Sequence, residues 1–171
     1  MLPKVASKVD YEAELVIVIG KTGKHIPNDD SAFAYVGGYT VGHDVSARDW
    51  QFRGEEKQWM LGKDFDTFAP VGPVIVTPDE GLDPHNLQIQ LRLNGTTMQN
   101  SNTKEFIFGV PHLQWFLSQV ITLEPGDLIF TGTPPGVGIA RKPPVLLKAG
   151  DIAEVEIEQI GILKNPVVAE S

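Results

Sequence analysis

The chain has 171 residues, of which 42% are apolar and 21% charged, and its formal net charge at pH 7 is −8. Domains usually hold about 100–200 residues, so we expect a single folded domain over residues 1–171. The negative charge argues against nucleic-acid binding, which depends on basic surface.

Two further absences narrow the class of protein. No apolar run approaches the roughly 18 residues that a membrane span needs, so we expect a cytoplasmic protein, with the mitochondrial matrix as the alternative. Cysteine is missing, which excludes disulfides, thiolate catalysis and zinc–cysteine sites.

The first predicted elements are a strand and a short helix. Residues 11–20 begin with polar and apolar residues in alternation and end in a β-branched run, which indicates a strand entering a core. An acidic or hydroxyl residue at 29–31 can cap a short helix that continues through Tyr35. We expect Gly37 and Gly38 to end this helix.

The middle of the chain is predicted to be mostly strands. A second strand is expected over residues 39–45, and the aromatic-rich segment 46–65 is interpreted as a functional loop with one helical turn. Prolines introduce a strand that ends at Thr77. Residues 87–93 alternate before Asn94-Gly95, a strong hairpin signal, so a return strand is expected over 96–100.

The last third contains the one convincing helix. Pro111 suits a first helical position, and apolar residues then recur at helical spacing up to Val120. Strands are expected to follow over residues 127–131, 151–160 and 162–168. The sequence therefore predicts a β-rich chain with few helices.

Three carboxylates are candidate metal ligands. Glu12 and Glu14 lie two residues apart on a predicted strand, so both side chains face the same side. Burying them together without a counterion would be costly. Asp44 lies at the far end of the next predicted strand, so pairing of the two strands can bring it to the same place.

The chemistry of this set favours a hard cation. Three carboxylates without a thiolate suit Mg²⁺ first, with Mn²⁺ or Ca²⁺ also compatible. Taken alone, an E-x-E pattern is more often a solvated strand face. The similar run Glu154, Glu156, Glu158 is interpreted as such a face, with no chemistry.

At the level of motifs the chain resembles the fumarylacetoacetate hydrolase family, and especially its small members that act on acylpyruvates, oxaloacetate and related dioic acids. The resemblance covers nearly the whole chain. It rests on an Asn-Gly hairpin and on four longer motifs in order, DYEAELVIVIGK, YVGGYTVGHDVSARDWQ, WMLGKDFDTFAPVGP and LEPGDLIFTGTPPGVG.

The resemblance implies a fold and a set of functional residues. The fold would be mainly β with few helices (α+β), a mixed β-sandwich roll of the fumarylacetoacetate hydrolase C-terminal domain type, commonly assembled as a homodimer. The metal ligands would be Glu12, Glu14 and Asp44, binding Mg²⁺ or Mn²⁺. The remaining site residues would be Lys63 and Thr133, as catalytic and substrate-binding residues, and Arg48 and Gln51, as substrate contacts.

Each of these substrate contacts has a plainer alternative. Arg48 can form a surface ion pair with Asp49, and Lys63 can be a solvated loop lysine. Residues 132–138 can be only a turn, and they lack the lysine of a phosphate-binding loop, so nucleotide binding is rejected.

The histidines and tryptophans are not expected to carry the chemistry. His43 neighbours Asp44, but strand alternation points it to the opposite face. The other three histidines lie in predicted loops or at a helix start. The tryptophans are expected to pack, with Trp59 also placed to help close the site.

Three hypotheses of function remain. The first is a metal-dependent hydrolase that cleaves a C–C bond in an acylpyruvate-like 2-oxo acid through a metal-stabilised enolate. The second is a tautomerase or isomerase of oxaloacetate or a hydroxydienedioate, with decarboxylation as a related reaction. The third is an inactive ligand-binding homologue. Hydrolytic family members carry an upstream lid with a histidine–glutamate dyad, which this chain does not include, so water activation is the open point.

Overall fold

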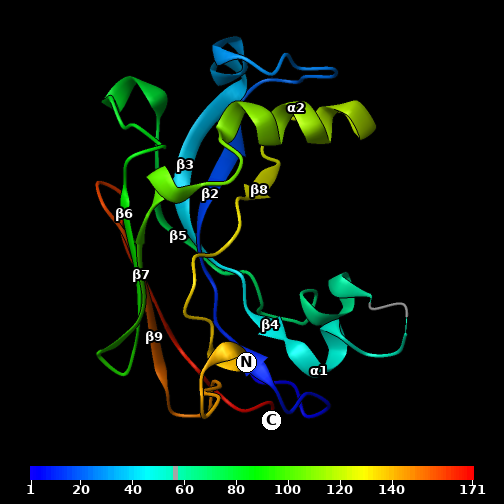
Figure 1. Ribbon diagram of the computed structural model, residues 1–171, viewed down its shortest axis with the longest axis vertical. Helices are drawn as coiled ribbons and strands as arrows, with labels where there is room; N and C mark the ends of the chain where they lie inside the picture. The colour runs from blue at the N-terminus through cyan, green and yellow to red at the C-terminus, as the bar shows by residue number, and fades with distance from the viewer. Residues whose placement is uncertain (56–57) are drawn as a thin grey trace.

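The computed structural model describes residues 1–55 and 58–171, and its strands form antiparallel sheets (Figure 1). One four-stranded sheet has the order β5 (Val71–Val76), β3 (Val36–His43), β2 (Ala13–Ile19) and β8 (Leu128–Phe130). The other has the order β10 (Gly161–Pro166), β9 (Ile152–Ile157), β6 (Gln88–Leu93) and β7 (Thr96–Asn102). A short ladder pairs β1 (Val9–Asp10) with β4 (Ser46–Ala47).

The helices are few and short. The α-helices are α1 (Arg48–Gln51) and α2 (Val110–Val120). Short 3₁₀-helices are η1 (Asp30–Tyr35), η2 (Trp59–Gly62), η3 (Pro78–Glu80), η4 (Thr103–Glu105) and η5 (Gly138–Ala140). In the part of the chain that the structure describes, no helix has the length and apolar character to cross a membrane. The predicted mainly β fold with few helices is confirmed.

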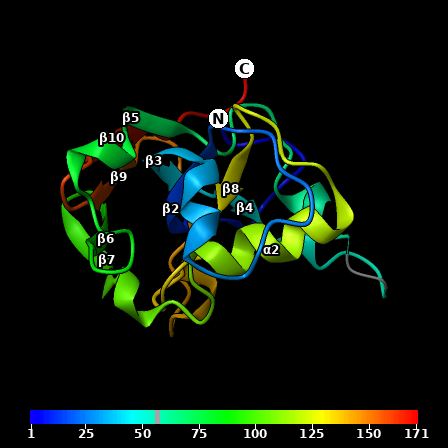
Figure 2. The ribbon, with the colours of Figure 1, turned by 90° about the horizontal axis from the view of Figure 1, so that it is seen from above.

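The core lies between the two four-stranded sheets, which face each other (Figure 2). Leu15 and Ile17 of β2 are fully buried there, as are Leu91 of β6 and Val155 of β9. Each such side chain contributes roughly 1.5–3 kcal/mol through its removal from water. This packing fixes the position of β2, which carries Glu14 and begins directly after Glu12.

Several sequence predictions are confirmed. The hairpin joins β6 to β7 through Asn94 and Gly95, whose φ angles of 52° and 78° are those that an Asn-Gly turn requires. Helix α2 begins at Val110, with the proline in its first turn. The side chain of His85 assists this start, because its Nε2 accepts a hydrogen bond of 3.0 Å from the Val110 backbone N–H.

Other boundaries differ from the predictions. Asp29 caps η1 as expected, but Gly37 and Gly38 lie inside β3 and do not end the helix. Glycine is needed at position 37 because an added Cβ would come within 2.9 Å of the Gly20 Cα. The loop predicted over 46–65 contains α1 and η2, and its residues 56–57 lie outside the described part of the chain.

Candidate metal centre

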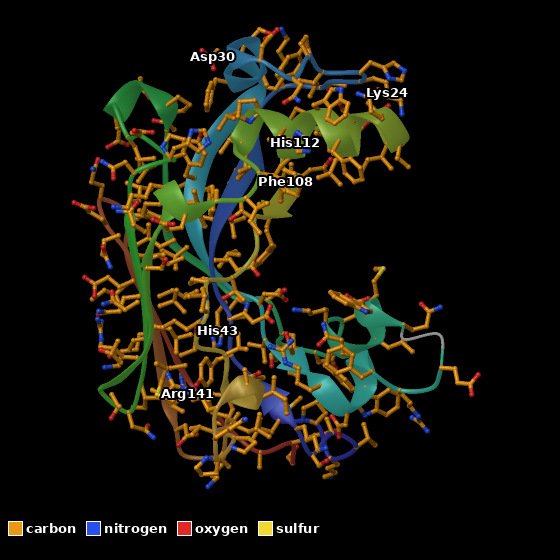
Figure 3. All side chains as sticks on the ribbon, in the orientation of Figure 1. Lys24, Asp30, His43, Phe108, His112 and Arg141 are labelled. Atoms are coloured by element: carbon orange, nitrogen blue, oxygen red, sulfur yellow. The ribbon has the colours of Figure 1, made fainter. Side chains whose placement is uncertain are left out.

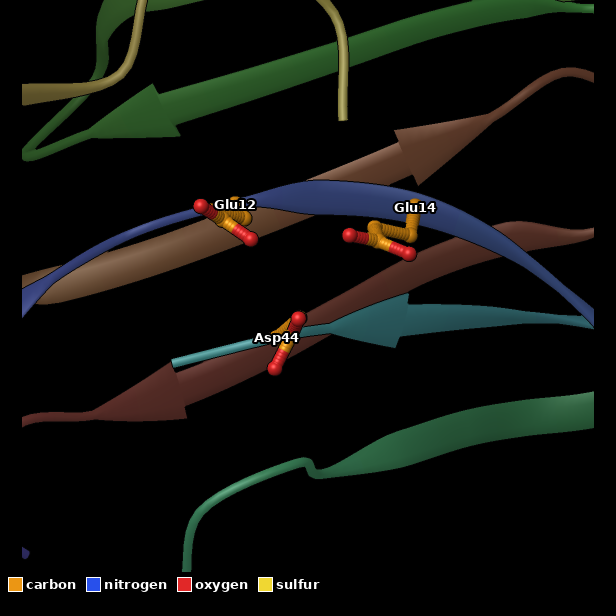
Figure 4. A group of neighbouring side chains, drawn as sticks. All are labelled: Glu12, Glu14 and Asp44. Atoms are coloured by element: carbon orange, nitrogen blue, oxygen red, sulfur yellow. The ribbon is translucent and has the colours of Figure 1, made fainter. Parts of the chain in front are cut away.

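The pairing of β2 with β3 brings three carboxylates together (Figure 4). Ala13 lies opposite His43 in the antiparallel register, and the Asp44 backbone N–H donates to the Glu12 carbonyl at 2.9 Å. Glu12 and Glu14 therefore point to the same side as Asp44. One oxygen from each of these three groups lies within 4.8 Å of the other two.

Burial makes this cluster electrostatically unusual. Glu12 is 8% exposed and Glu14 is 3% exposed. Burial, followed by the negative charges of Asp44 and Glu12, raises the pKa of Glu14 to about 8. Burial is also the main reason that the pKa of Asp44 is raised.

Glu14 receives one strong hydrogen bond from the loop after β8. The Gly132 backbone N–H donates to Glu14 Oε2 at 2.7 Å. Gly132 has a φ of 95°, a conformation that residues with a side chain rarely adopt. The glycine at this position thus allows the loop to turn its amide toward the carboxylate.

Lys63 supplies one positive charge to the cluster. Its Nζ donates to Glu12 Oε2 at 2.8 Å, to Asp44 Oδ2 at 2.5 Å and to the Ser46 hydroxyl at 2.6 Å. The lysine arrives from the residue after η2, about fifty positions along the chain from Glu12. It is therefore a part of the site, and the alternative of a solvated loop lysine is wrong.

Arg48 supplies the second positive charge and is 6% exposed. Its guanidinium donates to Asp10 Oδ2 at 2.9 Å, to Glu12 Oε1 at 2.6 Å and to Gln51 Oε1 at 2.9 Å. Burial alone would lower the pKa of Arg48, but the charges of Glu12 and Asp10 outweigh it and raise the pKa. The alternative of a surface pair with Asp49 is wrong, because Asp49 instead accepts hydrogen bonds from Ser7.

The charges of the site fit a divalent cation. Among residues 1–55 and 58–171, four carboxylates, from Asp10, Glu12, Glu14 and Asp44, face two cationic side chains, those of Arg48 and Lys63. Burial, and after it the charges of Asp44 and Glu12, raise the pKa of Glu14, so its carboxylate is destabilised where no cation is bound. Lys63 forms ion pairs with Glu12 and Asp44 and so balances part of their negative charge. Three convergent carboxylates are the donor set that Mg²⁺ and Mn²⁺ prefer.

The cluster opens into a cavity of about 790 Å³. Gln51 lies in its wall, and Trp59, which is 61% exposed, lies at its border. A second cavity of about 550 Å³ adjoins the first, and the two share Ile107 and the segment 132–135. The volume is ample for a small organic acid.

Thr133 lies in the wall of both cavities, but its hydroxyl is engaged within the protein. It donates to the Ala13 carbonyl at 2.9 Å and accepts from Gln99 Nε2 at 2.8 Å. The hydroxyl thus ties the 132–135 segment to the start of β2. Donation to a substrate oxygen would require it to rotate away from Ala13.

The histidines lie outside the cluster. His43 is buried on the opposite face of β3, and burial lowers its pKa to about 4. His112 stacks on Phe108 with ring centroids 4.5 Å apart, on the α2 side of the molecule and well away from His43 (Figure 3). Among the described residues, none of the residues lining the larger cavity is a histidine.

Sequence reasoning did not single out three residues that complete this arrangement. Asp10 is fully buried and binds Arg48, Ser46 binds Lys63, and Gln99 is 1% exposed and accepts a hydrogen bond of 2.9 Å from the Ala13 N–H. Asp10 could have been found, because it precedes Glu12 by two residues in the same alternation. Gln99 carried no signal, since its contacts are with residues far away in the chain.

The chain is similar to curated proteins along nearly all of its length. Oxaloacetate tautomerases named as mitochondrial are similar to the chain: one from Xenopus laevis is 56% identical over 167 residues, and one from Homo sapiens is 55% identical over 168. These alignments include 98% of the chain but 52% and 53% of the relatives. The chain thus spans about half the length of the curated relatives it matches.

Solved structures agree in fold. A 5-carboxymethyl-2-hydroxymuconate delta-isomerase from Mycobacterium smegmatis is 43% identical with a TM-score of 0.89, over 99% of this chain and 62% of that one. A fumarylpyruvate hydrolase from Pseudomonas aeruginosa, solved with Mn²⁺ and pyruvate, is 36% identical with a TM-score of 0.89, over 99% of this chain and 70% of that one. The family model described as fumarylacetoacetate (FAA) hydrolase C-terminal matches residues 1–168, and the chain belongs to this family.

Proposed function

We propose that residues 1–171 form the catalytic domain of an enzyme that binds Mg²⁺ or Mn²⁺ through Glu12, Glu14 and Asp44 and interconverts the enol and keto forms of oxaloacetate. The convergence of these three carboxylates within 4.8 Å carries the proposal. The names of the mitochondrial relatives and the Mn²⁺ and pyruvate of the Pseudomonas aeruginosa enzyme support it.

The cation has a defined task in this chemistry. When bound, it would offset the negative charge that develops on the oxygen of a 2-oxo acid as its enol loses a proton. The carboxylates suit this task because their combined charge exceeds that of Arg48 and Lys63.

Lys63 is the proposed proton-transfer residue. Tautomerisation removes a proton from the enol hydroxyl and adds one to the neighbouring carbon, so the numbers of atoms and electrons do not change. Nζ of Lys63 reaches Glu12, Asp44 and Ser46 and borders the cavity, which places an exchangeable proton at the acidic cluster. General acid–base catalysis of this kind contributes about 10²–10⁴-fold to a rate.

Arg48 and Gln51 are the proposed contacts to the second carboxylate of the substrate. Both lie in the cavity wall, and Arg48 Nη1 donates to Gln51 Oε1 at 2.9 Å. The pair can thus present N–H donors as one unit. Thr133 is proposed to contact substrate from the opposite wall, with its hydroxyl turned from Ala13.

Hydrolysis of a C–C bond in an acylpyruvate is the second candidate, favoured by the name of the Pseudomonas aeruginosa relative. It needs a group that activates water, and the described residues bring no histidine to the cavity. We rank it below tautomerisation because a keto–enol proton shift needs no activated water. A non-catalytic ligand-binding role would leave metal and oxalate binding intact without turnover.

The deciding experiment combines binding with turnover. We expect Mn²⁺ to raise the melting temperature, oxalate to raise it further only when Mn²⁺ is present, and the ultraviolet absorbance of oxaloacetate enol to decay faster with enzyme. Release of pyruvate from an acylpyruvate would instead favour hydrolysis. A melting temperature indifferent to Mg²⁺ and Mn²⁺ would contradict the proposal.

Assembly and location are also proposed. We infer a homodimer from the family resemblance, and exposed apolar side chains on α2, with Phe116 at 58% and Val120 at 77%, offer surface for it. Light scattering of the purified chain measures this directly. The names of the relatives favour the mitochondrial matrix over the cytoplasm, and imaging of the tagged full-length gene product tests that location.

A further inference from the structure

We propose that Asp10 is a positioning residue of the metal centre, which holds Arg48 so that Glu12 keeps its negative charge for the cation. The proposal rests on the proposed metal-binding function. It concerns a residue that is not one of the three convergent carboxylates and that binds Arg48 at a different nitrogen from Glu12.

Asp10 is a fully buried carboxylate with four hydrogen-bond donors around it. Oδ1 accepts from the backbone N–H groups of Tyr11 at 2.8 Å and Gly138 at 2.7 Å. Oδ2 accepts from Arg48 Nε at 2.9 Å and from the Ile139 N–H at 3.0 Å. A buried charge is tolerated when it is paired and its oxygens are satisfied, and both conditions are met here.

These contacts join Arg48 to a wall of the cavity. Gly138 begins η5, and the neighbouring residues Val137 and Ile139 line the cavity of the acidic cluster. The fit around Asp10 is tight, because a Cβ at Gly138 would lie 2.5 Å from Asp10 Oδ1 and 1.9 Å from the Val145 carbonyl. Arg141, labelled in Figure 3, fastens the same loop through Tyr11 Oη at 3.1 Å.

The guanidinium of Arg48 divides its charge between two carboxylates. Nε binds Asp10 while Nη2 binds Glu12 Oε1 at 2.6 Å. A cation that binds Glu12 competes with Arg48 for the charge of that carboxylate. Without the Asp10 charge, Arg48 would be neutralised by Glu12 alone and would compete more strongly. Asp10 therefore favours metal binding at a position that it does not reach itself.

The test is a double-mutant cycle on Mn²⁺ affinity, measured on the 171-residue chain by electron paramagnetic resonance of free Mn²⁺. Asp10→Asn keeps the shape of the side chain and removes its charge. We expect the dissociation constant for Mn²⁺ to rise about 10–100-fold, the range typical of groups that orient metal ligands. When Arg48 is already replaced by glutamine, the further change Asp10→Asn should alter the Mn²⁺ dissociation constant by no more than about twofold.

The cycle separates the proposed role from simpler ones. A purely through-space effect of the lost charge would weaken Mn²⁺ binding equally in both backgrounds, and that result would overturn the proposal, as would unchanged affinity in Asp10→Asn. Asp127→Asn is the matched control, since Asp127 also accepts a backbone N–H, from Glu124 at 2.8 Å, in a turn outside the two cavities. It should leave Mn²⁺ affinity unchanged even if it lowers the melting temperature.

If Asp10→Asn does not fold, Arg48→Gln alone must bind Mn²⁺ more tightly than the wild type, because the competing cation is gone; equal or weaker binding overturns the proposal. If the wild type itself does not bind Mn²⁺, the proposed function fails, and this outcome is distinct from wild-type binding that Asp10→Asn leaves intact.

Discussion

Two acidic strands of this protein share a sequence pattern and differ in chemistry. Asp10 at the end of β1, Glu12 between the strands and Glu14 in β2 alternate along the chain, and Glu154 and Glu156 alternate in β9. The first set is buried and lies near a further carboxylate, that of Asp44 directly after β3, whereas the Glu156 side chain is 43% exposed.

The electrostatic outcomes are opposite. Burial and neighbouring carboxylates raise the pKa of Glu14 to about 8. Hydrogen bonds from Lys164 and Arg92 lower the pKa of Glu154. The two acids of β9 pair with Arg92 and Lys164 on the neighbouring strands, at a solvated surface. Their negative charge is therefore balanced without a bound cation. Alternating acids therefore indicate a site only where other elements bury them and leave their charge uncompensated.

The largest effect is expected for Glu14→Gln, which removes one of the three carboxylates proposed to bind the cation. Saturating Mn²⁺, at about 100 times its dissociation constant, should stabilise the wild type by about 2.7 kcal/mol, or roughly 5–10 °C in melting temperature. We expect Glu14→Gln to lose this shift and more than about 100-fold of tautomerase turnover. The matched variant Glu156→Gln on β9 should keep both, and loss of the metal shift in both variants would contradict the distinction.

Lys63→Met is expected to lower turnover alone, and it therefore separates proton transfer from metal binding. Turnover of oxaloacetate enol should fall about 10²–10⁴-fold. Mn²⁺ binding should be retained or strengthened, because an ammonium that competes for Glu12 and Asp44 is removed. Lys164→Met, which breaks a 3.0 Å ion pair with Glu154 on the exposed strand, is the control and should leave turnover unchanged. Wild-type turnover in Lys63→Met would remove the lysine from the mechanism.

The smallest effect is expected at the ion pairs between Arg92 of β6 and the acids of β9. Arg92 pairs with Glu154 at 3.3 Å and with Glu156 at 2.6 Å, in a partly exposed position. Such pairs contribute about 0–1 kcal/mol and weaken with salt. Arg92→Met should therefore lower the free energy of unfolding by at most about 1 kcal/mol in urea denaturation, with unchanged Mn²⁺ affinity. A change in that affinity would show that β9 is coupled to the site.

Local patterns in the sequence determined most of the secondary structure and the centre of the site. Strand alternation, the Asn-Gly turn and the proline before α2 each act over a few residues, so their consequences could be predicted locally. The common face of Glu12 and Glu14 follows from the same periodicity, and the pairing of their strand with the next one placed Asp44 beside them.

Only the tertiary structure decided how the charges are shared. Arg48 binds Asp10 and Glu12 instead of its sequence neighbour Asp49. Lys63 binds Glu12, although the two residues are about fifty positions apart in the sequence. Gly132 reaches Glu14 from the loop after β8, and Gln99 of β7 accepts a hydrogen bond from the Ala13 N–H at the start of β2. Such contacts depend on which elements pack together and on how completely they exclude water, and no local pattern encodes either property.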